Sequence, residues 1–158
     1  MTRPPHEFIL GGQRSGKSRG AESRAAAWLA QPGRSAVLIA TALPGDDEMR
    51  ERIARHRADR ARRVLELLGL EEPRDLAMAL RRHSAASRLV VVDCLTLWLT
   101  NLLMPMHGEP LGDAALAPAT AALVEALRRA PGPVVLVSNE IGLGLTPLGR
   151  ADRDRAAR

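Results

Sequence analysis

The residues from Gly11 to Ser18 read GGQRSGKS and fit the pattern G-x-x-x-x-G-K-[ST], known as a P-loop. In such a loop the glycines let backbone N–H groups turn towards phosphate oxygens. Lys17 would place its charge on the β- and γ-phosphates of a nucleoside triphosphate, and Ser18 would offer a hydroxyl to Mg²⁺. Lys17 is also the only lysine in the chain. We therefore expect triphosphate binding here; the alternative is a glycine-rich turn that binds nothing.

A second candidate is Asp93, which ends the apolar run Leu89–Val92. A carboxylate at the end of a buried strand is typical of the Walker B position, where it holds Mg²⁺ directly or through water. The alternative is an aspartate that caps the helix that follows.

Residues 48–60 form a third candidate, because they combine dense charge with a histidine. On a helix, Arg52, His56 and Arg60 would share one face, whereas Met49 and Ile53 would form an apolar stripe that docks the helix. A neutral imidazole is a competent nucleophile towards phosphorus, and guanidinium groups beside it would hold the anion. The alternative is a solvated arginine-rich helix in which His56 has no role.

Two further segments follow apolar runs and would lie at the carboxyl edge of a sheet. Thr41 and Ala42 follow the run that ends at Ala40, and Asn139 and Glu140 follow the run 134–137. Both segments could contact a ligand, or could be simple turns.

The elements that must position these residues are predicted by apolar runs that alternate with helical patterns. Runs at 8–10, 36–40, 89–92 and 134–137 predict strands, the last three buried on both faces of a parallel sheet. Helices are expected over 18–30, from about 46, from beyond 74 to about 82, over 95–103 and over 114–129. This alternation predicts a single doubly wound α/β domain over residues 1–158, with a mostly parallel sheet flanked by helices on both faces.

Composition narrows the class of protein further. The net charge is +5 and the isoelectric point about 11.0, which would suit a polyanionic partner, but every Lys or Arg position except Lys17 is arginine. Arginine-rich coding explains this charge without nucleic acid, and aromatic residues, at 2%, are too scarce for base stacking. Cys94 is the only cysteine, and no apolar stretch approaches the ~20 residues of a membrane span. We therefore expect a cytoplasmic protein without signal peptide, membrane insertion or nucleic-acid partner.

Taken together, these segments resemble the bifunctional adenosylcobinamide kinase / adenosylcobinamide-phosphate guanylyltransferase family of cobalamin biosynthesis. Besides the P-loop, the shared motifs are H-R-A-D-R at 56–60, D-C-L-T-x-W-x-x-N-L-L at 93–103 and N-E-I-G-x-G at 139–144. The resemblance implies a P-loop NTPase-like fold, a homo-oligomer and two reactions. ATP or GTP phosphorylates the aminopropanol hydroxyl of adenosylcobinamide; GMP from GTP then passes through a histidine to adenosylcobinamide phosphate, giving adenosylcobinamide-GDP.

The resemblance also implies the site residues. His56 matches the guanylylated histidine and Lys17 the catalytic lysine, with Mg²⁺ at Ser18 and Asp93. Nucleotide contacts are implied for Gly11, Gly12, Gln13, Arg14, Ser15, Gly16, Lys17, Ser18, Ala40, Thr41, Ala42, Arg57, Ala58, Asp59, Arg60, Glu71 and Asp93.

Three departures from the family pattern stand in the sequence. Residues 61–71 lack the Pro and Trp of the family's usual R-P-x-x-W-x-T-x-E motif and lengthen the spacing to Glu71. Residues 147–158 match the family's arginine-rich segment only loosely. The helix and strand with which the family normally ends are expected to be missing. Two other functions are compatible with the residues: a simple P-loop kinase of a small molecule without the guanylyl step, and a non-catalytic, arginine-rich nucleotide- or RNA-binding module.

Overall fold

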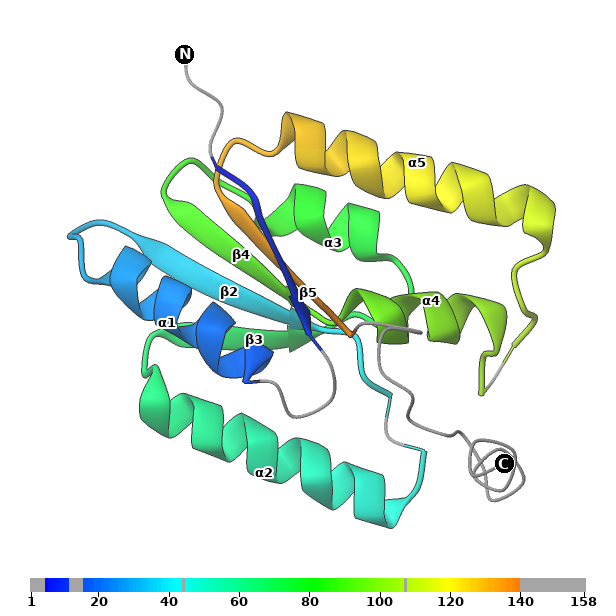
Figure 1. Cartoon of the computed structure of the whole chain (residues 1–158), viewed down its shortest axis with the longest axis horizontal. Helices are drawn as coiled ribbons and strands as arrows, with labels where there is room; N and C mark the ends of the chain where they lie inside the picture. The colour runs from blue at the N-terminus through cyan, green and yellow to red at the C-terminus, as the bar shows by residue number, and fades with distance from the viewer. Residues whose placement is uncertain (1–4, 12–15, 44, 107, 140–158) are drawn as a thin grey trace, which may run out of the picture.

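The computed structural model of the chain describes residues 5–11, 16–43, 45–106 and 108–139. These residues form a parallel sheet whose strands alternate with helices (Figure 1). In chain order the elements are β1 (Glu7–Gly11), α1 (Lys17–Leu29), β2 (Ser35–Ala40), α2 (Asp47–Arg63), β3 (Leu67–Glu71), α3 (Leu76–His83), β4 (Arg88–Asp93), α4 (Leu95–Leu103), α5 (Asp113–Arg129) and β5 (Val134–Asn139).

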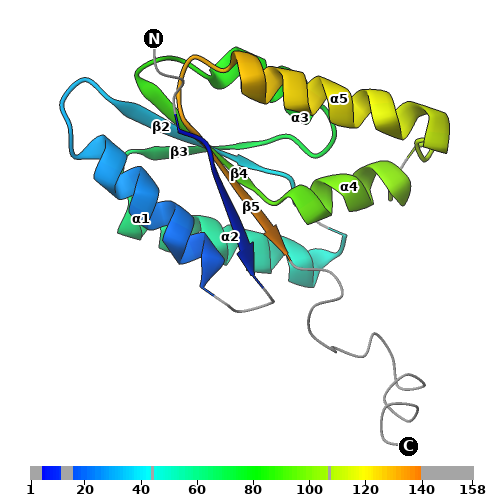
Figure 2. The ribbon, with the colours of Figure 1, turned by 45° about the horizontal axis from the view of Figure 1, so that its top comes forward.

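The five strands lie in the order β1-β5-β4-β2-β3, and every pairing is parallel. Helices α1 and α2 cover one face of the sheet, and α3, α4 and α5 cover the other (Figures 1 and 2). The expected α/β architecture, with helices on both faces of a parallel sheet, is therefore confirmed. Within the described residues, no helix is both long enough and apolar enough to cross a membrane.

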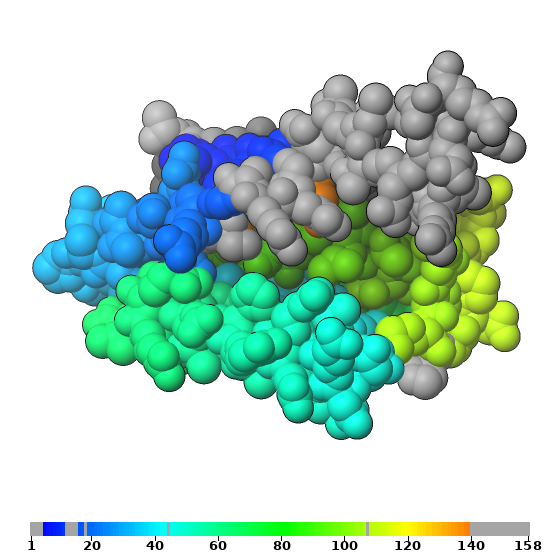
Figure 3. All heavy atoms as spheres, turned by 60° about the horizontal axis from the view of Figure 1, so that its bottom comes forward, coloured from blue at the N-terminus to red at the C-terminus, as the bar shows by residue number. Residues whose placement is uncertain are grey.

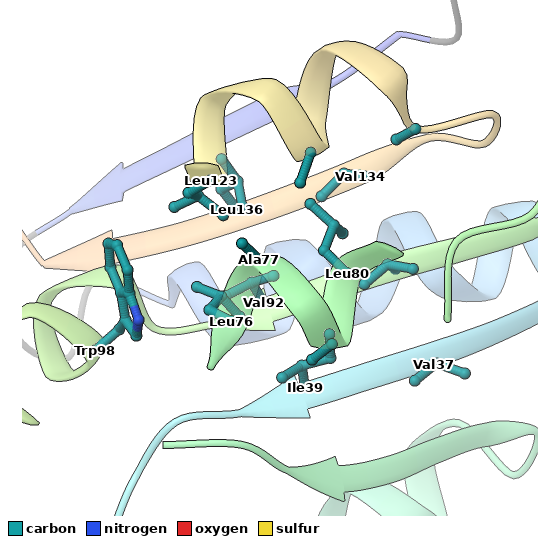
Figure 4. Packing of buried hydrophobic residues seen from close by; sticks show 14 of the residues in the cluster. Val37, Ile39, Leu76, Ala77, Leu80, Val92, Trp98, Leu123, Val134 and Leu136 are labelled. Carbon is teal, nitrogen blue, oxygen red and sulfur yellow. The ribbon is translucent and has the colours of Figure 1, made fainter. Parts of the chain in front are cut away.

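The core has two layers because successive strand residues point to opposite faces. Val90, Val92 and Leu136 pack with α3, α4 and α5 (Figure 4). Leu89 and Val91 point the other way and pack with Ala21 and Ala25 of α1. The central strands β4 and β5 are buried on both faces, as their unbroken apolar runs predicted.

Strand register brings the candidate residues to one edge of the sheet. Ala40 at the end of β2 is opposite both Asp93 of β4 and Glu71 of β3, and Gly11 at the end of β1 is opposite Asn139 of β5. All of these residues end their strands at the carboxyl edge, which is where open α/β sheets bind their ligands.

Strand β3 is the element that the local sequence pattern does not predict. Its sequence, LLGLE, continues a helix-forming stretch and contains a glycine but no β-branched residue, so local pattern does not favour a strand. The segment pairs with β2 as an edge strand, with Leu68 largely exposed. Glu71 consequently ends a strand at the carboxyl edge, instead of lying in an extended helical segment.

Candidate active site

The turn before α1 has the geometry that a phosphate-binding loop needs at its end. Gly16 precedes the helix with φ of 77°, a left-handed conformation that favours glycine, and Lys17 is the first helical residue. The N-cap residue Gly16 makes no side-chain capping bond, and the positive end of the α1 dipole lies at the edge of the sheet. Gly12, Gln13, Arg14, Ser15 and the Ser18 side chain lie outside the described residues.

A cavity of about 470 Å³ opens near the start of α1 and brings together seven of the candidate residues, from β2 and the segment after it, from α2 and from β4. Helix α2 lies across this side of the molecule, with α1 beside one half of it and α4 behind the other (Figure 3). The cavity is lined by Arg19, Glu22, Ala40, Ala42, Ile53, His56, Arg57, Asp59, Arg60, Arg63, Asp93 and Leu97. A larger hollow, of about 790 Å³, is lined only by residues of α5 and contains none of the motif residues.

Helix α2 contributes His56, Arg57 and Arg60 to this cavity, yet it contains no buried residue. The expectation that Met49 and Ile53 would dock the helix through a buried stripe is therefore wrong: Met49 is exposed and Ile53 is only half-buried at the cavity wall. Arg52, expected on the His56 face, is absent from the lining.

Ion pairs hold α2 in place instead. Arg63 donates two hydrogen bonds, of 2.7 and 2.9 Å, to the carboxylate of Glu22 on α1. Arg57 forms an ion pair with Glu71 at the end of β3. At the start of the helix, the Asp46 side chain accepts a hydrogen bond of 2.7 Å from the Met49 N–H. The two ion pairs join α2 to α1 and to β3, and both of their arginines line the cavity, whereas the Asp46 bond caps the first turn of α2 itself.

Asp93 faces the cavity from β4, on the sheet face that carries Leu89 and Val91. Burial raises the pKa of its carboxyl above the ordinary value, while Coulombic interaction with Arg60, Lys17 and His56 acts in the opposite direction. Among the described residues, no hydrogen bond or ion pair involves the Asp93 side chain. A half-buried carboxylate in this state is a ready ligand for a cation.

Asn139 supplies a second oxygen atom on the same face. It ends β5, two residues beyond the partner of Asp93, and its Oδ1 atom is buried without a hydrogen-bond partner in the described part of the chain. No group of three or more His, Cys, Asp or Glu side chains is found there that could hold a metal alone. A hard ion that takes few protein ligands and completes its shell with phosphates and water, such as Mg²⁺, fits these oxygens.

Thr41 has a different environment from its neighbours. It is fully buried, and its hydroxyl donates to the Cys94 carbonyl at 2.7 Å and accepts from the Cys94 N–H at 2.9 Å. The Asn101 side chain donates to the Thr41 carbonyl, which ties α4 to the same point. Only Ala40 and Ala42 of this trio line the cavity, and Thr41 joins the ends of β2 and β4 beneath it.

The remaining candidates lie around the cavity. Glu71 contacts it through the ion pair with Arg57, and Asp59 lies in its wall, whereas Ala58 belongs to α2 but not to the lining. Thr96, next to the cavity-lining Leu97, links α4 to β5. Its hydroxyl forms hydrogen bonds with the Ser138 hydroxyl and with the Asn139 backbone N–H. Glu140 lies outside the described residues.

Several residues of the cavity wall were not predicted. Glu22 and Arg63 are the clearest, since their pairing joins two helices that are separated by a strand in the sequence. Glu22 could have been identified because it lies next to the apolar positions Ala21 and Ala25, which are buried. A carboxylate at such a position needs a hydrogen-bonding or charged partner. For Arg19 and Leu97 we find no local signal.

Comparison with known proteins gives this site its family. The profile of the family described as cobinamide kinase / cobinamide phosphate guanyltransferase matches residues 7–157. The chain is 49% identical to the bifunctional adenosylcobalamin biosynthesis protein CobP of Pseudomonas aeruginosa over 147 residues, which is 93% of this chain and 78% of that protein. It is 34% identical to the CobU proteins of Escherichia coli and Salmonella typhimurium over 162 and 164 residues, 96% of this chain and 85% of each relative. A profile match over nearly the whole chain, together with these identities, shows that the chain belongs to the cobinamide kinase / cobinamide phosphate guanyltransferase family.

Proposed function

We propose that both reactions of this bifunctional kinase and guanylyltransferase take place at the one cavity, and that His56 carries the guanylyl group. The observation that supports this most directly is the meeting of His56, from α2, with Asp93, from β4, in a single cavity beside the start of α1. A nucleotide whose phosphates lie at the P-loop would therefore be within the same enclosure as the proposed nucleophile.

In the kinase reaction, the aminopropanol hydroxyl of adenosylcobinamide attacks the γ-phosphorus of ATP or GTP. The new O–P bond forms as the bond to the bridging oxygen breaks, the nucleoside diphosphate leaves, and the hydroxyl proton passes to water. Lys17 and the N-terminus of α1 hold the phosphate charge during this step. His56 is not required for it.

In the guanylyl reaction, a ring nitrogen of His56 attacks the α-phosphorus of GTP and pyrophosphate leaves. An oxygen of adenosylcobinamide phosphate then attacks the same phosphorus, the P–N bond breaks, and adenosylcobinamide-GDP is released with free His56. Arg57 and Arg60, which line the cavity on the same helix, are placed to hold the phosphates. The covalent intermediate divides one displacement into two easier ones.

Mg²⁺ would be held by Asp93 and by the Ser18 hydroxyl, with Asn139 as a further oxygen beside Asp93. Bound there, the ion would neutralise charge on the triphosphate oxygens. The other proposed nucleotide contacts are those of the P-loop, Ala40 to Ala42, Arg57 to Arg60 and Glu71. We also propose that the protein is cytoplasmic and forms a homo-oligomer. Light scattering after size exclusion would test the oligomer.

The experiment that tests the proposed function is incubation with GTP labelled at the α-phosphate. We expect acid-labile, alkali-stable label on the wild-type protein and none on His56→Ala, because a phosphoramidate needs the imidazole nitrogen. His56→Ala should retain phosphorylation of adenosylcobinamide within a few-fold, and His83→Ala, on α3, should behave as wild type. Phosphorylation without any label on active wild-type protein would instead indicate a simple kinase and contradict the role of His56.

A further inference from the structure

Helix α4 is apolar almost all round, although only part of it is buried. Its sequence, LTLWLTNLL, buries Trp98, Asn101 and Leu102 against the sheet. Leu97 remains 39% exposed and Met104, directly after the helix, 72% exposed. A helix that is hydrophobic on every side is normally covered on every side, so the outer face of α4 is suited to contact another apolar body.

This exposed face is continuous with the active-site cavity. Leu97 lines the cavity, and the helical period of 3.6 residues puts Met104, the C-cap residue of α4 seven positions further on, about two turns away on the same side. Met106, 50% exposed, packs against Gly45 in the segment before α2: a Cβ atom at Gly45 would lie 3.2 Å from the Met106 methyl group. Figure 3 shows the chain that follows α4 meeting the start of α2. We call Leu97, Met104 and Met106 the methionine face.

The size of the cavity indicates what this face contacts. A volume of about 470 Å³ suits one ligand of ordinary size, and the nucleotide needs that space. Cobinamide, the substrate of the family, is a corrinoid: its broad macrocycle carries methyl groups and hydrocarbon rim as well as amide arms, and its reacting hydroxyl is at the end of one of these arms. The ring therefore has to lie outside the cavity, next to its mouth. Methionine side chains are flexible and polarizable, which suits them to a large, irregular apolar ligand.

We propose that the methionine face binds the corrinoid ring of cobinamide, with the aminopropanol arm directed past Leu97 into the cavity. This inference rests on the proposed function, since it takes its ligand from the kinase reaction. It adds a binding surface to that function: the nucleotide occupies the cavity between α1, α2 and β4, and the corrinoid lies on α4 and the residues that follow it.

The test is the double substitution Met104→Gln, Met106→Gln, which keeps side-chain length and adds polarity. We expect the KM for adenosylcobinamide to rise about tenfold, as loss of part of the apolar contact of two methionines requires. The KM for GTP, the kcat and the melting temperature should stay at wild-type values. Met78→Gln, on α3 and 46% exposed, is the matched control and should leave every parameter unchanged. Direct binding can be followed by the visible absorbance of the corrinoid.

Each other outcome is informative. An unchanged KM for adenosylcobinamide in the double variant would overturn the methionine face as its binding site while leaving the proposed function intact. Equal increases in the KM values for GTP and cobinamide would also overturn it, because the effect would not be specific to the corrinoid. A wild-type oligomer that dissociates in the double variant, with KM unchanged, would identify a second copy of the chain as the partner of this face. By contrast, wild-type protein that binds GTP but phosphorylates no cobinamide would contradict the proposed function itself.

Discussion

Asp93 shows most clearly that a single residue can lower the stability of the fold while it serves the proposed chemistry of this site. Burial raises the pKa of its carboxyl, so the folded protein holds a proton more tightly there than the unfolded chain does. Protonated Asp93 therefore adds to the free energy of unfolding. The contribution is complete below the ordinary carboxyl pKa of the unfolded chain, and it is lost as the pH rises through the raised pKa of the folded protein. Wherever the side chain is ionised, its buried charge disfavours folding until a cation compensates it.

We predict that Asp93→Asn stabilises the nucleotide-free protein at pH 7 and inactivates the enzyme. The amide has the shape of the carboxyl without its charge, so the gain should be on the order of 1 kcal/mol, about 2–4 °C in Tm. Both transfer reactions should fall by at least about a hundredfold, because the proposed Mg²⁺ ligand is lost. Thermal unfolding from pH 4 to 8 measures the first effect and product formation the second.

The control for this prediction is Asp75→Asn, an exposed carboxylate at the start of α3. It should change neither activity nor the pH dependence of Tm. If Asp93→Asn were less stable than wild type at pH 7 and showed the same pH dependence, burial of its charge would not be the dominant effect.

At the scale of elements, α2 is a helix that bears the proposed nucleophile but takes its position from ion pairs. Glu22 is nearly buried on α1, and its two hydrogen bonds to Arg63 hold the last turn of α2. The Arg63–Glu22 interaction also raises the pKa of Arg63, in keeping with a charge-assisted bond. In the proposed function, the kinase reaction would use α1 and β4, whereas the guanylyl reaction would additionally need His56 at its correct place on α2.

We predict that Glu22→Gln impairs guanylyl transfer more than kinase activity. Loss of one charge of a part-exposed pair should reduce the free energy of unfolding by about 1–2 kcal/mol. A misplacement of His56 by about 1 Å could reduce labelling by about a hundredfold. The measurement is the ratio of α-phosphate labelling to cobinamide phosphorylation in the same preparation.

Glu125→Gln serves as the matched control, because it breaks an exposed ion pair with Arg129 within α5. It should cost less than about 0.5 kcal/mol and leave the ratio of activities unchanged. A Glu22→Gln variant that lost both activities in proportion would show that Glu22 supports the fold in general and does not position α2.

At the scale of elements, the reasons why some features could be predicted from the sequence and others could not are clear. Unbroken apolar runs predicted β2, β4 and β5, and the rule that ligands bind at carboxyl edges brought Asp93 and Ala40 together. The strand β3 was missed because its stability comes from pairing with β2, which no local pattern records. The Glu22–Arg63 pair was missed for a related reason, since a contact between side chains of two helices depends on how the helices pack. His56 was a candidate because of its arginine neighbours, but its role was implied only by the family resemblance and stays a prediction, although the residue does line the cavity.

At the scale of the whole molecule, the net charge of +5 and the arginines of the cavity favour the approach of a triphosphate. We predict that the KM for GTP rises roughly tenfold when NaCl is raised from about 0.1 M to about 1 M, because the Debye length falls from ~10 Å to ~3 Å. Initial rates at fixed, saturating cobinamide measure this dependence.

Substitutions of two arginines distinguish attraction of GTP by the cavity's positive charges from a general effect of salt. Arg19→Gln, at the cavity wall, should weaken the salt dependence, whereas Arg128→Gln, on the exposed side of α5, should leave it close to wild type. Equal effects of the two substitutions would mean that net charge alone governs the approach of GTP, without a contribution from the arginines that surround the cavity.

Lys17, half-buried at the first position of α1, gives the protein an unusual property for labelling chemistry. Because it is the chain's only lysine, an amine-directed reagent has one side-chain target here besides the terminal amine. That target is the residue expected to touch the nucleotide's phosphates, so the mass added by acylation, beyond that at the terminal amine, becomes a count of vacant sites. Occupancy by any triphosphate could then be read from the intact mass of the protein, without a radioactive ligand and without turnover.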